Sequence, residues 1–104
     1  MTDIRKIKTA SLYEHKYSYS RAVQAGDWIF VSNTAGRNYD TREIAPDAAG
    51  QTEQAFRNVE AALARLGASL KDVVRVRVSV PDPHDVDAVL AIVGERFRGI
   101  DPAN

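Results

Sequence analysis

The chain has 104 residues, a hydrophobic fraction of 44% and no cysteine, which together predict one globular domain over residues 1–104 and exclude disulfides and thiolate sites. Its 14 lysines and arginines balance 14 aspartates and glutamates, so the basic excess typical of nucleic-acid binders is absent and we expect no nucleic-acid partner. Because no apolar run is long enough to span a bilayer and residues 1–10 lack an apolar signal core, we expect a cytoplasmic protein with no membrane partner.

The first third of the chain predicts strands. A short edge strand within residues 1–16 would be anchored by Ile4, Ile7 and Leu12. β-favouring residues over 17–24 and 27–34, separated by a tight turn at 25–27, predict a hairpin. Its second strand should show Trp28 and Phe30 on one face and Ile29 and Val31 on the other.

Residues 35–50 predict a loop, and a long helix follows it. The helix begins either after Asp47 as N-cap or at Thr52, and Gly67 suits its left-handed end. Asn58, at the edge of the apolar stripe, is expected to hold a neighbouring loop by hydrogen bonds. Apolar residues recur at helical spacing at Ala55, Phe56, Val59, Ala62, Leu63 and Leu66.

The pattern then changes to that of a strand over residues 74–80. Valines at every second position alternate with Arg75, Arg77 and Ser79, which predicts one apolar and one polar face. The arginines have two interpretations. They are solvated or paired on the polar face, or one of them binds an anionic ligand.

A second amphipathic helix is predicted near the C-terminus. Asp82 is a suitable N-cap, Pro83 suits the first helical position, and Gly99 ends the helix. Its apolar stripe comprises Val86, Val89, Leu90, Val93 and Phe97. The element order indicates an α+β fold with two helices packed on one face of a sheet.

Short motifs in this order resemble the RidA (YjgF) family. They are Tyr19-Ser-Arg-Ala-Val23, Gly26-Asp27, Phe30-Val-Ser32, Gln51-Thr-Glu-Gln54, Asn58-Val59, Gly67-Ala-Ser-Leu70 and Asp72-Val-Val74. The resemblance implies a chorismate-mutase-like mixed sheet, a homotrimer with small-molecule sites in intersubunit clefts, and no cofactor. It also implies hydrolysis of enamines and imines such as 2-aminoacrylate to a keto acid and ammonia. The family continues past residue 104 with two further strands, so we expect the C-terminal strands to be missing from this chain.

The resemblance assigns ligand contacts to a few positions and no catalytic residue. Tyr19 matches the site tyrosine, and Ser32 matches a strand-end serine whose neighbour, usually glycine, is Asn33 here. Asn104 stands where the family has an arginine that clamps the substrate carboxylate, and Leu90 replaces a site asparagine. Arg77 is the candidate replacement for the clamp. This pattern implies a divergent member with reduced or altered deaminase activity.

Three functions are therefore open. The first is an imine or enamine deaminase with altered specificity, and the second is a non-catalytic trimer that binds a small metabolite. The third, a translation-inhibiting endoribonuclease, is disfavoured by the zero net charge and the lack of a histidine pair. Ser32 has no histidine placed to activate it as a nucleophile, and isolated His15 and His84 suggest no metal site.

Overall fold

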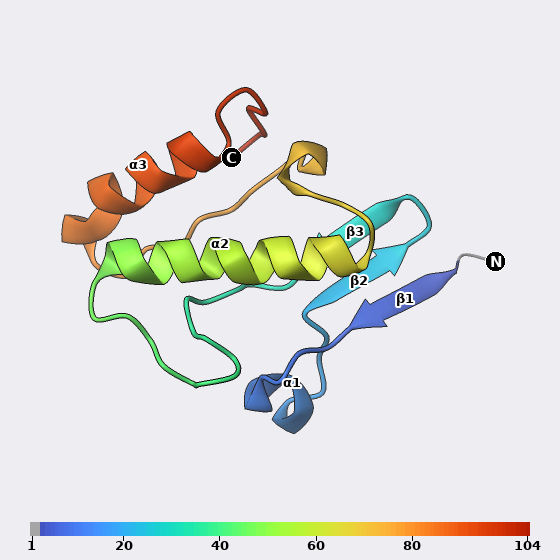
Figure 1. The fold of residues 1–104 in the computed structure, drawn as a ribbon. Helices are drawn as coiled ribbons and strands as arrows, with labels where there is room; N and C mark the ends of the chain where they lie inside the picture. The colour runs from blue at the N-terminus through green and yellow to red at the C-terminus, as the bar shows by residue number, and fades with distance from the viewer. Residues whose placement is uncertain (1–2) are drawn as a thin grey trace.

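A three-stranded antiparallel sheet forms one side of the protein in the computed structural model, which describes residues 3–104 (Figure 1). The strands β1 (Ile4–Ile7), β2 (Ala22–Ala25) and β3 (Trp28–Val31) lie side by side in chain order. The predicted hairpin is confirmed, since β2 and β3 pair around a turn at Gly26, whose φ is +59°. The edge strand is confirmed too, but Leu12 lies outside it and instead begins a short helix.

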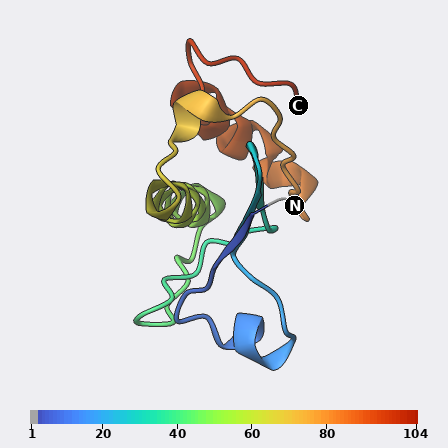
Figure 2. The ribbon, with the colours of Figure 1, turned by 90° about the vertical axis from the view of Figure 1, so that its right-hand side faces the viewer.

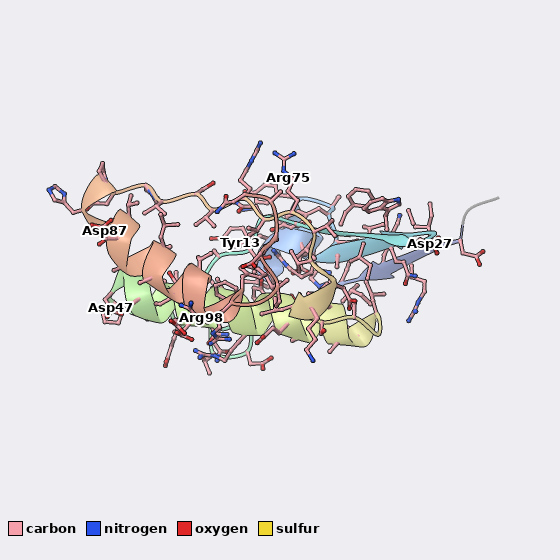
Figure 3. The ribbon with its side chains drawn as sticks, turned by 90° about the horizontal axis from the view of Figure 1, so that it is seen from above. Tyr13, Asp27, Asp47, Arg75, Asp87 and Arg98 are labelled. Atoms are coloured by element: carbon pink, nitrogen blue, oxygen red, sulfur yellow. The ribbon has the colours of Figure 1, made fainter. Side chains whose placement is uncertain are left out.

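The long helix α2 (Ala48–Arg65) packs along one face of this sheet (Figures 1 and 2). It begins after Asp47, the first of the two predicted starts, because the Asp47 carboxylate accepts a hydrogen bond of 3.0 Å from the Gly50 amide (Figure 3). It is followed by Gly67, which has the expected positive φ of +75°. The helix stripe is buried mainly through Phe56, Ala62, Leu63 and Leu66.

The segment 74–80 was expected to be a strand, and that prediction is wrong. After the 3₁₀ turn Leu70–Asp72, the chain is extended but pairs with another segment only at a parallel bridge between Arg75 and Ala103. An extended chain becomes a strand only where a neighbour satisfies its backbone, and within residues 3–104 this segment has one such point. The predicted faces still hold in part, because Val76, Val78 and Val80 pack on the core while Arg75, Arg77 and Ser79 are exposed.

The second predicted helix is α3 (Val86–Arg96), which packs beside α2. A 3₁₀ turn, Pro83–Asp85, leads into it, and the Asp82 carboxylate caps that turn by accepting a bond of 3.0 Å from the His84 amide. Val89, Val93 and Phe97 join the core as predicted. Leu90 does not, because its side chain is 43% exposed.

Two further segments lie at the end of the molecule below the sheet in Figure 1: the short helix α1 (Leu12–Lys16) and the loop between β3 and α2. Asn58 holds that loop as predicted, since its buried amide donates to the carbonyls of Ala35 at 3.1 Å and Arg37 at 2.8 Å. Gly36 allows the loop to approach α2, because a Cβ there would lie 2.1 Å from the Gln51 carbonyl oxygen. The position of the loop is therefore set by α2.

Candidate functional site

A buried ion pair between Glu14 and Arg21 lies at the centre of the candidate site. The Glu14 side chain is 0% exposed and that of Arg21 3% exposed, and Arg21 Nε donates to Glu14 Oε2 at 3.1 Å. Thr9 completes the environment of the carboxylate, donating its amide at 2.7 Å and its hydroxyl at 2.6 Å. Each carboxylate oxygen therefore accepts at least one short hydrogen bond, as a buried charge requires.

The backbone around β2 determines where the Arg21 guanidinium lies. The Arg21 amide donates to the Ile7 carbonyl at 2.7 Å, and the Arg21 carbonyl accepts from the Ser32 amide at 2.9 Å, which extends the sheet by one residue. The guanidinium lies over two aromatic rings, 5.5 Å from the centre of Tyr19 and 5.3 Å from that of Tyr39. Such stacking suits arginine because its cation is planar and weakly hydrated.

Three of the residues singled out in the sequence contact Arg21, two of them at its guanidinium. Arg21 Nη2 donates to the Tyr19 hydroxyl at 3.4 Å, and Nη1 donates to the Asn33 carbonyl at 2.8 Å. Ser32 is adjacent, and its hydroxyl donates to the Ser20 carbonyl at 2.6 Å. That bond occupies the Ser32 proton with a backbone acceptor, which is the ordinary structural use of a serine at a strand end.

Asn104 and Arg77 lie in a different part of the structure from the group around Arg21. The Val76 amide donates to the Ala103 carbonyl at 2.8 Å, and the Ala103 amide donates to the Val74 carbonyl at 3.0 Å, so this pairing places Asn104 beside the 75–77 segment. Arg75 points away from the helices (Figure 3), and Arg77 is also exposed. Within residues 3–104, no hydrogen bond or ion pair joins Asn104 or Arg77 to the group around Arg21.

Sequence reasoning missed the central pair and Tyr39. Arg21 appeared only as part of a family motif, and Glu14 lies in a helix of five residues, too short for a periodic pattern. One signal was available, since Arg21 directly precedes Ala22 at the start of a strand with a buried face. An arginine among inward-facing residues needs an acidic partner, and Glu14 is a nearby one.

The pKa of the Glu14 carboxyl provides a test of this arrangement. Burial by itself raises that pKa, but the hydrogen bonds from Thr9 and the contact with Arg21 outweigh burial and hold it below the ordinary value of 4.5. A depressed folded-state pKa adds stability that is fully present above the ordinary value and is lost as the pH falls through the folded-state pKa.

We therefore expect the difference in the free energy of unfolding between the native protein and E14Q to shrink as the pH falls from neutral to below about 4. Urea titrations of both proteins across that range would measure it. Glutamine does not titrate, so E14Q is the reference. A difference that stays constant or grows in acid would contradict the assignment.

Metal and membrane signatures are both lacking in the part of the chain that the structure describes. Across residues 3–104, no three histidine, aspartate or glutamate side chains gather as a metal site would require. Likewise, none of the described helices combines the length and apolar character of a membrane span.

Comparisons with known proteins give a consistent result. The family model described as Endoribonuclease L-PSP matches residues 10–104. An uncharacterized protein of Streptomyces coelicolor is 32% identical over 95% of this chain and 74% of its own length. A 2-iminobutanoate/2-iminopropanoate deaminase of Dermatophagoides farinae is 33% identical, over 82% of this chain and 67% of its own. A crystal structure of a YjgF/YER057c/UK114 family member from Mycobacterium tuberculosis superposes with a TM-score of 0.86 at 34% identity, covering 97% of this chain and 80% of that one.

Proposed function

The chain belongs to the endoribonuclease L-PSP family, also called the RidA or YjgF family, and we propose that it hydrolyses a small imine or enamine to a carbonyl compound and ammonia. The observation that carries the proposal is that Tyr19, Ser32 and Asn33 all contact Arg21, the Tyr19 hydroxyl and the Asn33 carbonyl at its guanidinium and the Ser32 amide at its carbonyl. The deaminase name of one relative supports the same chemistry.

The group around Arg21 suits the binding of an imine. Because the Tyr19 hydroxyl accepts from Arg21 Nη2, its own proton is available to a ligand. Water adds to the imine carbon, the C–N bond breaks, and the nitrogen leaves as ammonia while the carbon becomes a carbonyl. A tyrosine donor that orients the imine and stabilises developing charge would lower the barrier to the addition step.

Recognition of a substrate carboxylate is proposed to be weak. Asn104 stands in the clamp position, and an amide offers hydrogen bonds without charge. The pairing of Ala103 with the 74–76 segment brings Arg75 and Arg77 near Asn104 in register, so either cation is a candidate for a partial replacement.

The site is proposed to be completed by two further copies of the chain. Trp28 and Phe30 are each 63% exposed and lie on the strand face opposite the residues that pack on α2. Apolar side chains at this exposure favour association. Analytical ultracentrifugation of a homotrimer should give a molecular mass three times the 11.5 kDa of one chain. The mass of a monomer would contradict this part of the proposal.

The decisive experiment is an assay of ammonia release against a panel of imines generated in the cuvette, some with and some without a carboxylate. We expect turnover above the buffer rate for at least one imine, and a loss of at least about tenfold in Y19F, since the variant lacks one donor to the transition state. Y17F is the matched control because Tyr17 is exposed. No turnover on any member of the panel would remove the enzymatic claim.

A second candidate function is binding of a small metabolite without catalysis. It is favoured by the engagement of the polar groups at the site, since both Glu14 oxygens and the Ser32 proton already have protein partners. Saturable binding of a panel member with no turnover would select this function. An endoribonuclease is less supported, because His15 and His84 lie on separate elements and, among the described residues, each ring bonds only a local oxygen.

A further inference from the structure

A cavity of about 260 Å³ lies between α1 and the loop that precedes α2. Its charged side chains are all basic, and they come from both segments: Lys16 from α1, and Arg37 and Arg42 from the loop. Leu12, Tyr13 and Tyr39 contribute apolar and aromatic surface to the same cavity. The cavity thus combines an apolar lining with three cations.

None of these cations has an acidic partner among the residues that the structure describes. Within residues 3–104, the ion pairs involve other basic residues, and neither Lys16, Arg37 nor Arg42 is among them. Arg37 Nη1 donates to the Arg42 carbonyl at 2.7 Å, and the Lys16 ammonium lies 5.4 Å from the centre of the Tyr17 ring. These contacts position two of the cations but do not neutralise them, so their mutual repulsion favours an anion in the cavity.

The loop that carries the two arginines is held in one conformation. Arg42 has a φ of +67°, rare for a residue with a side chain, and its amide donates to the Asn38 carbonyl at 2.7 Å. The Asn38 amide in turn donates to the Glu43 carbonyl at 2.9 Å. Because Asn58 of α2 also holds the Arg37 carbonyl, the backbone that carries both arginines is positioned by contacts within the protein.

Tyr39 lines the cavity as a neutral side chain. Its hydroxyl is buried and has no hydrogen-bond partner among the described residues. Burial raises the pKa of this hydroxyl, more than the nearby Arg21 cation lowers it, so the group remains a neutral donor at physiological pH. Because this hydroxyl is closed off from solvent, the ring of Tyr39 is the part that a ligand in the cavity would contact.

We propose that this cavity binds a small organic carboxylate whose apolar or aromatic body packs on Leu12, Tyr13 and Tyr39 while its carboxylate contacts the basic side chains. The apolar lining distinguishes this ligand from an inorganic anion, which would gain nothing from aromatic contact. The cavity shares Tyr39 with the surroundings of Arg21 but none of Tyr19, Ser32 and Asn33, and the inference holds whether or not that group is catalytic.

Calorimetric titration with phenylacetate tests the proposal, with the neutral phenylacetamide and inorganic phosphate as comparisons. We expect saturable phenylacetate binding, and binding at least about tenfold weaker for phenylacetamide, since the charge-assisted contacts are lost. R37Q and R42Q should each weaken phenylacetate binding about fivefold or more. R98Q lies two residues after the end of α3, a helix that Figure 1 shows on the opposite side of the molecule from α1; it makes the same charge change and should leave binding unaltered.

Phenylacetate and phenylacetamide of equal affinity, or phosphate as tight as phenylacetate, would overturn the assignment of an organic carboxylate. Absence of saturable phenylacetate binding would overturn it as well. Amide chemical shifts recorded during the titration separate local from global effects, because changes confined to α1 and residues 37–42 support the cavity and changes only elsewhere contradict it. Failure of the ammonia assay has no bearing on these outcomes.

Discussion

R21M should lower the free energy of unfolding by about 3–5 kcal/mol, the range expected when one partner of a buried ion pair is removed. The Glu14 carboxylate is 0% exposed, and in this variant it would keep only its hydrogen bonds from Thr9. The Arg21 guanidinium also bonds Tyr19, Asn33 and Thr34, so its loss frees several acceptors at once. Urea unfolding at neutral pH measures the effect.

The double variant E14M/R21M tests the cause of that loss. It removes both charges and should be more stable than R21M, because no unpaired charge is left in the interior. R75M is the matched control, since Arg75 is exposed and its replacement should change stability by no more than about 0.5 kcal/mol. A double variant as unstable as R21M would show that packing around the guanidinium, rather than charge pairing, carries its contribution.

Most of the fold follows from local patterns that the sequence displays. The start of α2 at Asp47, the turn at Gly26 and the end of α2 near Gly67 each depend on one residue whose chemistry suits one backbone conformation. The apolar stripes of α2 and α3 reflect helical periodicity, and in a long helix the apolar spacing repeats over several turns. These features could be predicted because the determining residues are adjacent in the chain.

The alternating pattern of residues 74–80 could not by itself show whether this segment pairs as a strand. Alternation describes which side chains face the core, and Val76, Val78 and Val80 do face it. Whether an extended segment pairs depends on whether another extended backbone lies beside it, and within the described residues only Ala103 forms a bridge with this segment. Leu90 shows a second limit of sequence patterns. It belongs to the apolar stripe of α3, but that stripe is wider than the face of α3 that α2 covers.

The candidate site was harder to predict, for a different reason. Tyr19, Ser32 and Asn33 were identified by resemblance, and their common centre, Arg21, was not. A side chain that organises its neighbours through hydrogen bonds to carbonyls leaves no periodic mark in a sequence. The cavity beside α1 likewise depends on α1 and a loop some twenty residues after Lys16, Arg37 to Arg42, whose place is set by Asn58 on α2.

N104R should increase kcat/KM for carboxylated imines by roughly two orders of magnitude, if Asn104 occupies the position from which a guanidinium would clamp the carboxylate. A bidentate, charge-assisted contact of this kind stabilises a bound carboxylate by a few kcal/mol, and each 1.4 kcal/mol corresponds to about tenfold. Ammonia release from 2-iminopropanoate measures the gain. Because Asn104 is exposed, the substitution should leave the fold intact.

The neutral imines of the panel separate a restored clamp from a general activation. A guanidinium at residue 104 has no carboxylate to bind in those substrates, so their kcat/KM should change little, and N104Q should leave both classes near the native rate. An equal gain for neutral and carboxylated imines would place the effect outside carboxylate recognition. No gain for either class, in a protein that still turns over an imine, would show that residue 104 does not face the substrate carboxylate, and Arg77 would then be the next position to replace.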